Sequence, residues 1–488
     1  MKPKIPMRNL FLLSLLTFVL PWCISAQVSL AWITNSSVKQ EQVIGDVDWA
    51  TGSNTVSQTI THFNIEGTDI SSSFASGTKR IFIFGDTFGF NISYNAADPV
   101  AWSTTTNGEQ GLLLNFYTNS DGSDVFVKPI GISMAGDDTP NAGICISNVN
   151  YLICNTGSDF TLTNRHAHDY SVLVTFNQTN LTFQTNRTIS VLTNGGHFII
   201  TSLRQFGTNV LMFGAGAYRA SDIFLATTPV SSYLNGSGTL YFTGLTNGQP
   251  TWSIAETNAV PVVQDNPTNG PPWTNDTPSV GNMSVIYSTN LSLWLMTYDA
   301  GRNTDDETNT TGIYFTYAAQ PWGPWSTPQL IFNAARDHGF GVFIHNNAYS
   351  PTGPDGPTTA QTSTNASGAV YAPYLIESFT RITNSTVFIY YTMATWNPYT
   401  VVKMRSAFSI TPVIDPASLV KLKKKFSFAW SAPTNITYQV DYSTNLTSGW
   451  TTFTNLISST NGTFNFTDEG TNSGGFGSTK YYRLRASN

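Results

Sequence analysis

The chain has few charged side chains, few cysteines and, beyond its N-terminus, no long apolar run. Only 11% of its 488 residues are charged, against about a quarter in typical soluble proteins, and the net charge is −6. No basic stripe follows the main part of the chain, so we expect no nucleic-acid partner. No later run approaches about 18 apolar residues, so we expect no membrane insertion. The sequence also predicts no cofactor, and it leaves the oligomeric state open.

Cysteine is nearly absent, and the first of the three cysteines precedes the expected mature chain. Cys145 and Cys154 lie on what the sequence predicts to be one hairpin. A turn at residues 149–150 would set them opposite each other and permit a disulfide in an oxidising compartment. A turn at residues 147–148 would not, so the register of the hairpin decides between the two alternatives.

The N-terminus has the features of a processing signal. Lys2, Lys4 and Arg8 form a positive segment that precedes a short apolar run. Small residues then offer a cleavage site after Ala26. We therefore expect residues 1–26 to be a signal peptide, and the mature protein to be secreted, periplasmic or held at the cell surface.

Aromatic residues, in contrast, reach 13%, and asparagine, threonine and serine fill most polar positions. This composition favours an extracellular all-β protein. Short strand pairs recur between loops rich in asparagine, glycine and proline, near residues 79–117, 142–176, 197–242, 282–332 and 341–408. Five comparable antiparallel units predict a five-bladed β-propeller over residues 27–410, with a β-sandwich as the alternative.

Two carboxylates occur where one of these strand pairs is expected. The apolar run 81–84 leads to Asp86, and Asp69 lies seventeen residues upstream of Asp86. A turn at Gly77 would pair the two segments as a hairpin and set the aspartates opposite each other, roughly 5 Å apart at Cα. Two carboxylates this close resist ionising together, which suits acid–base chemistry and favours a glycoside hydrolase. The alternative is that Asp86 only hydrogen-bonds a turn.

An ordered set of segments resembles a secreted family of five-bladed β-propellers, long catalogued as a domain of unknown function. The segments are residues 67–70, 82–89, 139–143, 214–221, 281–287, 322–326, 371–376 and 391–399. Some members are endo-D-arabinanases that cut the D-arabinan of mycobacterial cell walls. The resemblance implies that Asp69 and Asp86 are catalytic and that Tyr371 and Asn282 contact substrate. This sequence departs from the family's pattern at Asn282, where relatives are expected to carry a glutamate. The substrate specificity of this protein therefore need not match theirs.

Other polar and aromatic residues are candidates for substrate contacts. Arg219 and Tyr218 lie in a glycine-flanked turn, where they would either clamp sugar hydroxyls or form hydrogen bonds between blades. Trp396 and Tyr399 flank an Asn-Pro pair and would either stack on sugar faces or pack in the core. The spacing of these residues leaves both alternatives open.

Two segments have the residue types of a metal site. His166, His168 and Asp169 would present both imidazoles on one face of an extended segment, but no third convergent ligand is visible. An oxygen-rich loop has the ligands for calcium but lacks the EF-hand spacing; it contains Asp299, Asn303, Asp305 and Glu307. We therefore predict no metal.

The aromatic pattern stops at residues 411–425, where prolines and a cluster of lysines predict a linker. Beyond it, residues 426–430, 438–442 and 481–485 alternate apolar and polar side chains, as sandwich strands do. Residues 426–488 resemble the fibronectin-like modules that end many secreted bacterial proteins. We interpret them as an accessory β-sandwich.

Three functional classes remain open. The aspartate pair and the resemblance favour an endo-acting glycoside hydrolase of a polysaccharide such as D-arabinan. The many aromatics, the few charges and Asn282 instead fit a glycan-binding propeller without catalysis. Only the terminal module suggests a structural or adhesive surface protein.

Overall fold

The protein is almost entirely β-structure, as the sequence predicts. The computed structural model describes residues 28–89, 92, 97–157, 168–265, 279–301, 312–346, 368–434, 436–476 and 479–487, so the expected signal peptide lies outside it. Within these ranges the only α-helix is α1 (Thr59–Phe63). The 3-10 turns are η1 (Leu192–Asn194), η2 (Val230–Ser232), η3 (Glu256–Asn258), η5 (Glu377–Phe379) and η6 (Pro416–Ser418). None of these helices has the length and apolar content of a membrane span.

Four antiparallel sheets follow one another along the chain, each with its strands in sequence order. The first contains β5 (Ile65–Ser76), β6 (Lys79–Gly89), β7 (Val100–Ser103) and β8 (Asn115–Phe116). The second contains β9 (Pro140–Ile146), β10 (Val149–Thr156), β11 (Tyr170–Asn177) and β12 (Thr182–Val191). The third contains β13 (Ile200–Phe206), β14 (Asn209–Ala215), β15 (Phe224–Pro229), β16 (Leu240–Thr246) and β17 (Gln249–Ser253). The fourth contains β18 (Val280–Ser288), β19 (Leu293–Ala300), β20 (Gly312–Ala318) and β21 (Gln329–Phe332).

The fifth sheet joins the two ends of this larger unit. It is built on β22 (Ala369–Leu375), β24 (Thr386–Trp396) and β25 (Thr400–Ile414), with β23 (Arg381–Thr383) paired to β24. Two N-terminal strands, β1 (Val28–Trp32) and β2 (Val38–Gln42), pair with β25, and the hairpin of β3 (Val47–Asp48) and β4 (Ser53–Asn54) follows them. The start of the described chain is therefore bonded to the last sheet of the unit.

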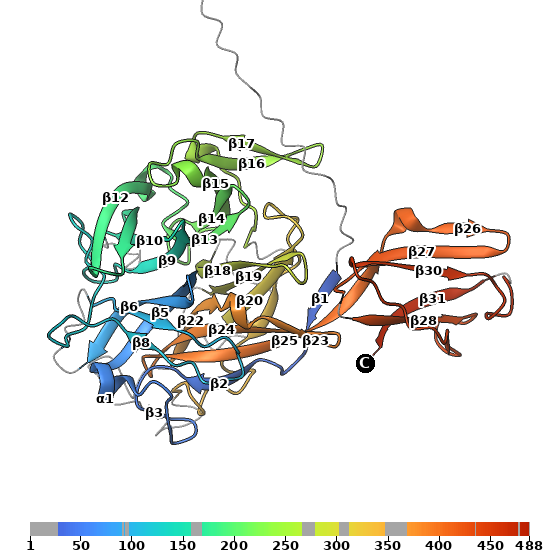
Figure 1. The fold of residues 1–488 in the computed structure, drawn as a ribbon, viewed down its shortest axis with the longest axis horizontal. Coiled ribbons are helices and arrows are strands. Elements are labelled where there is room, and N and C mark those ends of the chain that lie inside the picture. The colour runs from blue at the N-terminus through green and yellow to red at the C-terminus, as the bar shows by residue number, and fades with distance from the viewer. Residues whose placement is uncertain are drawn as a thin grey trace, which may run out of the picture.

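The first strands of the five sheets contact one another in sequence order. We call β5, β9, β13, β18 and β22 the inner strands. Contacts link each of them to the next, and β22 in turn contacts β5. Figure 1 shows the inner strands toward the middle of the larger unit, with strands such as β12 and β17 farther out. Residues that begin different inner strands are thereby brought together, although they are far apart in sequence.

The β5–β6 hairpin forms where the sequence predicts it. Ser76 pairs with Lys79 across a two-residue turn at Gly77 and Thr78, and the ladder runs back to the start of β5. Gly77 has φ 60°, a left-handed conformation that glycine adopts at little cost. The turn chemistry therefore sets the pairing of the two strands that carry the aspartates.

The register of this hairpin shifts beside the aspartates. Thr68 pairs with Thr87. Asp69 and Asp86 each lie one position from this pair, on the same side of it, but the expected direct pairing between them is absent from the ladder. The reason is the backbone at Ile70, whose φ of 61° is rare for a β-branched residue and interrupts regular pairing. The two aspartates are neighbours across the hairpin without being paired.

Buried polar side chains join neighbouring inner strands. Asn141 of β9 accepts hydrogen bonds through Oδ1 from the backbone N and from Oγ1 of Thr201 in β13, at 3.0 and 2.9 Å. Oγ of Ser202 in β13 accepts one from the backbone N of Val285 in β18, at 2.9 Å. Oγ of Ser284 in β18 accepts one from the backbone N of the last residue of β22, at 3.0 Å. Directed bonds, and not apolar contact alone, therefore set how adjacent sheets meet.

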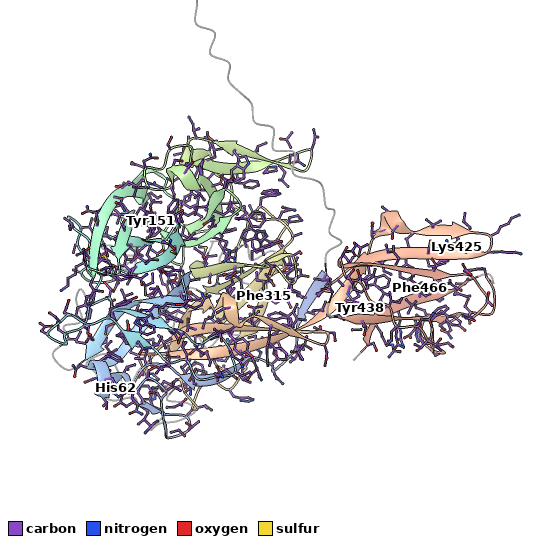
Figure 2. All side chains as sticks on the ribbon, in the orientation of Figure 1. His62, Tyr151, Phe315, Lys425, Tyr438 and Phe466 are labelled. Atoms are coloured by element: carbon purple, nitrogen blue, oxygen red, sulfur yellow. The ribbon has the colours of Figure 1, made fainter. Side chains whose placement is uncertain are left out.

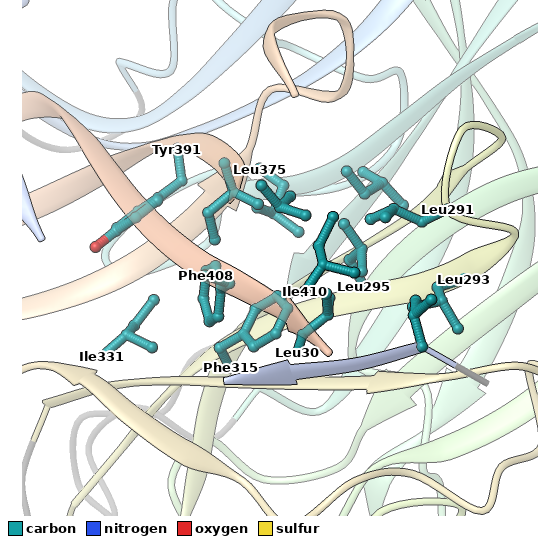
Figure 3. Packing of buried hydrophobic residues seen from close by; sticks show 14 of the residues in the cluster. Leu30, Leu291, Leu293, Leu295, Phe315, Ile331, Leu375, Tyr391, Phe408 and Ile410 are labelled. Atoms are coloured by element: carbon teal, nitrogen blue, oxygen red, sulfur yellow. The ribbon is translucent and has the colours of Figure 1, made fainter. Parts of the chain in front are cut away.

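The largest apolar core includes residues of the fourth and fifth sheets and reaches the N-terminal strand. Figure 3 groups Leu30 of β1 with Phe315 of β20 and with Phe408 and Ile410 of β25. The ring centroids of Phe315 and Phe408 lie 4.1 Å apart. Strand β1 is thus held by buried apolar contacts as well as by its ladder with β25.

The C-terminal unit consists of two sheets that pack against each other. One sheet contains β26 (Val420–Leu422), β27 (Lys425–Ser431) and β30 (Thr463–Asp468), and the other β28 (Thr437–Ser443), β29 (Thr451–Thr452) and β31 (Tyr481–Ser487). The rings of Trp430 in β27 and Tyr438 in β28 meet at 5.7 Å, and Phe466 of β30 is buried with them (Figure 2). Aromatic side chains from both sheets therefore form the core of this unit.

The segment 411–425 differs from the expected linker because it carries regular structure. β25 continues to Ile414, where it pairs with Trp430 of β27. The turn η6 follows, and β26 then pairs with β27. One strand thus runs from the larger unit into the C-terminal unit, because its ladder continues onto β27.

The two cysteines are free thiols, so the alternative without a disulfide is the one that the structure adopts. A two-residue turn at Ser147 and Asn148, with φ of 50° and 65°, joins β9 to β10. Positive φ at both central residues is the signature of a type I′ hairpin turn. In this register Cys145 faces Asn150 and not Cys154.

The inter-sheet bond of Ser284 gives a testable expectation. Ser284→Ala leaves the backbone N–H of Leu375 buried without its acceptor, which costs about 1–3 kcal/mol. The main unfolding transition, followed by circular dichroism in urea, should therefore shift to lower urea concentration. The exposed Ser458→Ala is the matched control and should leave the midpoint unchanged. Equal midpoints for both variants would contradict a stabilising role of this bond.

Candidate functional site

Asp69 lies in the first half of β5 and is buried. Its side chain covers Gly85 on the neighbouring strand, since a Cβ at Gly85 would collide with Oδ1 of Asp69. The hydroxyl of Tyr371, near the start of β22, donates a hydrogen bond to Oδ2 of Asp69 at 3.0 Å. The contact between β22 and β5 thus brings Tyr371, predicted to contact substrate, into hydrogen-bonding distance of Asp69, predicted to be catalytic.

The environment of Asp69 changes its acidity. Burial raises the pKa of Asp69 to about 7. The hydroxyls of Tyr371 and Tyr399 stabilise the ionised form and lower the pKa, whereas the negative charge of Asp137 raises it. Near neutral pH the carboxyl is therefore divided between its protonated and ionised forms. Such a group is suited to donate or accept a proton.

Asp86 is buried on β6, next to the strand of Asp69. The hydroxyl of Tyr399 donates a hydrogen bond to the backbone O of Asp86 at 3.0 Å. Tyr399 is itself buried, and its ring meets those of Phe88 and Trp396 edge-on, at 5.3 and 6.2 Å. The packing alternative for Tyr399 is therefore the one found, although its hydroxyl supports the strand that carries Asp86. Trp396 is half-buried beside it.

Asp98 is a third carboxyl at this site, and sequence reasoning missed it. The residue is fully buried, and neither carboxyl oxygen has a hydrogen-bond partner within the described part of the chain. Burial raises the pKa of Asp98 well above its ordinary value, and the charges of Asp69 and Asp138 raise it further. A lone aspartate before Pro99 resembles an ordinary turn residue, so no sequence signal marks it.

Asp299, at the end of β19, accepts bonds from three separate segments: the loop after β14, strand β18 and strand β22. Its Oδ2 accepts from Nε and Nη2 of Arg219, at 3.4 and 3.3 Å, and from the hydroxyl of Tyr218 at 3.5 Å. Its Oδ1 accepts from the backbone N of Asn282 at 2.8 Å and of Ala372 at 3.2 Å. Burial raises the pKa of Asp299, and the charge of Arg219 lowers it. Arg219 and Tyr218 thus bond between sheets, as one of their two alternatives predicts.

The backbone around Asp299 is strained. Arg219 and Ala372 have φ of 54° and 52°, a left-handed region that non-glycine residues seldom occupy. Such conformations cost of order 1–3 kcal/mol each and persist only where surrounding contacts determine them. A Cβ at Gly281 would also collide with Oδ2 of Asp299. The strained residues Arg219 and Ala372 both bond to the Asp299 carboxylate, and Gly281 leaves room for it.

Asn282 occupies the position where a glutamate was expected, and it is buried. Its Nδ2 donates a hydrogen bond to the hydroxyl of Tyr374 at 2.9 Å, which joins β18 to β22. Burial raises the pKa of Tyr374, so its hydroxyl keeps its proton at neutral pH. Asn282 therefore supplies an uncharged hydrogen bond where a glutamate would supply a carboxylate. The carboxyl groups found at this site all belong to aspartates.

Among the described residues, no three histidine, cysteine, aspartate or glutamate side chains come together as a metal site would require. Nε2 of His168 donates to the backbone O of Asp137 at 2.7 Å, and Nδ1 lies 3.3 Å from Nδ2 of Asn155. His168, just before β11, is thus bonded to the loop before β9, which gives it a structural role. Four other candidate metal ligands lie outside the described residues: His166, Asn303, Asp305 and Glu307.

The raised pKa of Asp69 predicts how stability depends on pH. An aspartate that titrates near 4 when unfolded and near 7 when folded contributes stability below pH 4 that is lost as pH rises through 7. Asp69→Asn removes this loss, so at pH 8 it should raise the free energy of unfolding by up to about 4 kcal/mol, with little change at pH 4.

Urea unfolding at both pH values measures the difference. The exposed Asp121→Asn serves as the matched control and should show no gain at pH 8. A pH-independent effect of Asp69→Asn would show that the Asp69 carboxyl does not carry a raised pKa.

The fold was compared with solved structures. An exo-beta-1,3-galactanase of Phanerochaete chrysosporium shares 9% identity and a TM-score of 0.39, over 92% of this chain and 99% of that one. An endo-1,5-alpha-L-arabinanase of Thermotoga petrophila shares 10% identity and a TM-score of 0.38, over 83% and 99%. An alpha-L-arabinofuranosidase of Podospora anserina shares 9% identity and a TM-score of 0.37, over 79% and 97%. At such scores these likenesses assign no activity to this chain.

Sequence comparison gives a firmer result. A search of curated proteins found no match. A family model, in contrast, matches residues 54–405, which include all five inner strands and every candidate residue of the site. Because the match covers well over half of the chain, the protein belongs to the family described as Domain of unknown function (DUF4185).

Proposed function

We propose that this protein is a glycoside hydrolase that cleaves internal bonds of a polysaccharide with Asp69 and Asp86. One observation carries the proposal. Asp69 is a buried carboxyl whose pKa is raised to about 7, and a second buried carboxyl lies beside it on the paired strand. Glycosidases require two carboxyl groups, of which one keeps a proton near neutral pH.

The two carboxyls take different roles in this proposal. Asp69 protonates the oxygen of the leaving group, since burial favours its neutral form. Asp86 acts at the anomeric carbon, either directly as a nucleophile or through a water molecule. The configuration of the first product, read by NMR, distinguishes these two courses. Tyr371 and Tyr399 act as positioning residues, because each hydrogen-bonds one of the two aspartates.

The fold that we propose for residues 27–410 is a five-bladed β-propeller with each of the five sheets as a blade. The order of contacts from β5 through β22 and back to β5 supports it, as does the pairing of β1 and β2 with the last sheet. Propellers gather their binding sites around the central channel. Asp69, Asn282 and Tyr371 all lie in the first halves of inner strands, which suits such a position.

The substrate, location and C-terminal unit complete the proposal. D-arabinan is the first substrate to test, because the sequence resembles arabinanases in the segments that carry Asp69 and Asp86. The apolar run with its small-residue cleavage site supports secretion. The aromatic core shared by two sheets supports a fibronectin-like accessory module over residues 426–488.

Asp86→Asn should abolish hydrolysis. The substitution keeps the shape of the side chain but removes its charge, and acid–base catalysis alone is typically worth about 10²–10⁴ in rate. Release of reducing sugar from D-arabinan, L-arabinan, galactan and host-type glycans measures the effect, with Asp121→Asn as the exposed control.

Three outcomes of this assay are decisive. A ladder of oligosaccharides supports endo-cleavage, whereas release of monosaccharide alone contradicts it. Turnover of Asp86→Asn near that of the unmodified protein contradicts a catalytic role for Asp86. If the unmodified protein binds a glycan but cleaves none, the protein is a glycan-binding propeller and not a hydrolase.

Tyr371→Phe should shift the pH dependence of hydrolysis. The Tyr371 hydroxyl stabilises ionised Asp69, so its removal raises the pKa of Asp69. If Asp69 is the acid, the alkaline limb of the kcat profile moves to higher pH. Tyr481→Phe, an exposed tyrosine of the C-terminal unit, provides the control. An alkaline limb that stays in place would show that Asp69 is not the acid that sets it.

A further inference from the structure

A cavity lies at the end of the inner strands opposite to Asp69. Strands β18 and β22 run in a common direction, since Asn282 bonds to Tyr374 and Ser284, farther along β18, bonds to Leu375, farther along β22. The cavity has a volume of about 320 Å³ and is lined by the middle and later residues of β5, β9, β13 and β18 and by the last residue of β22. It is therefore separate from the aspartate site at the starts of these strands.

The lining of this cavity is positively charged. Arg80 of β6 and Arg204 of β13 face a single carboxylate, Glu377 of η5. Arg204 forms an ion pair with Glu377, and both side chains are about 30% exposed, at 28% and 31%. The opening is therefore reachable from solvent, and two guanidinium groups are balanced by one carboxylate.

Several donors on this lining are not used. No hydrogen bond or ion pair joins the Arg80 guanidinium to any residue in the described ranges. Nε of Arg204 and Oγ of Ser73 are buried, and within the same ranges they too have no hydrogen-bond partner. Burial lowers the pKa of Arg80, and the negative charge of Glu377 raises it. The positive charge of Arg204 lowers it further, because the two guanidinium groups repel each other. An anion between them would relieve this repulsion.

A second cavity extends the site. It has a volume of about 280 Å³ and shares Ala75, Arg80, Ile286 and Glu377 with the first. Arg80 and Glu377 therefore stand where the two cavities meet, and Arg204 lines the first cavity only. Pockets of roughly 300 Å³ and above accommodate small ligands in proteins.

We infer that this cavity binds a small ligand that carries an oxyanion, with Arg80 and Arg204 as the groups that bind its charge. A guanidinium matches the planar pair of oxygens in a carboxylate and also binds sulfate and phosphate. Ser73 supplies a neutral hydrogen bond to the remainder of the ligand. An acidic sugar such as a uronate and a free inorganic oxyanion share this chemistry. The inference does not depend on hydrolysis at Asp69.

Isothermal titration of the full chain at pH 7 and constant ionic strength tests the site, with glucuronate, glucose, sulfate and phosphate as probes. We expect saturable binding of glucuronate and none of glucose at the same concentrations. Competition by sulfate or phosphate assigns the site to oxyanions in general, whereas its absence assigns it to acidic sugars. If none of the three anions binds saturably, the inference is wrong.

Variants locate the binding. Arg80→Gln should weaken glucuronate binding roughly tenfold to hundredfold, as expected for loss of a charge-assisted hydrogen bond. Glu377→Gln should strengthen it, because the competing carboxylate is removed, and this variant decides the matter if Arg80→Gln does not fold.

Two controls separate this site from other effects. Lys425→Gln removes one positive charge from an exposed position in the C-terminal unit (Figure 2) and should leave affinity unchanged. Asp69→Asn should also leave it unchanged, which separates this site from the proposed hydrolytic one. Equal affinity in Arg80→Gln, Glu377→Gln and Lys425→Gln would place the anion elsewhere and overturn the inference.

Discussion

The hydrogen bonds between neighbouring inner strands are the interaction on which the rest of this structure depends. Apolar contacts would allow adjacent sheets to slide, because the hydrophobic effect has no direction. The side chains of Asn141, Ser202 and Ser284 bond to groups of the next inner strand, so the second to the fifth sheets each meet the next in one register. These polar groups are buried, and a register without the bonds would leave them unsatisfied. Tyr371 of the fifth sheet then reaches Asp69 of the first, where β22 contacts β5.

Three of the four buried carboxyls of the site have clearly different environments. Asp299 has the charge of Arg219 and two backbone donors, which offset its burial. Asp98 has no hydrogen-bond partner in the described ranges, so its neutral form is favoured. Asp69 lies between these cases, with burial opposed by tyrosine hydroxyls. Chemically identical side chains thus meet different opposing influences, and the one whose pKa is raised to about 7, Asp69, is suited to proton transfer near neutral pH.

The two ends of the inner strands differ in charge because the strands share a direction. Their first halves carry Asp69 and Asn282, and their second halves lead to Arg204 and, just beyond β22, to Glu377. A set of strands with mixed directions would have placed Asp69 and Arg204 at the same end, where they could pair. Common direction therefore separates the aspartate site from the cavity that Arg80 and Arg204 line.

Local features of the sequence determined the all-β class and the β5–β6 hairpin, because strand alternation and the turn at Gly77 act over a few residues. They placed Asp69 and Asp86 on neighbouring strands, but the left-handed backbone at Ile70 altered their pairing. The register that leaves Cys145 unbonded was one of two that the sequence allowed. Only the tertiary structure decided that Asp98 joins the site, that Arg219 bonds to Asp299, and that β1 pairs with β25. These contacts connect residues far apart in the chain, and their formation depends on how whole sheets meet, which no local pattern encodes.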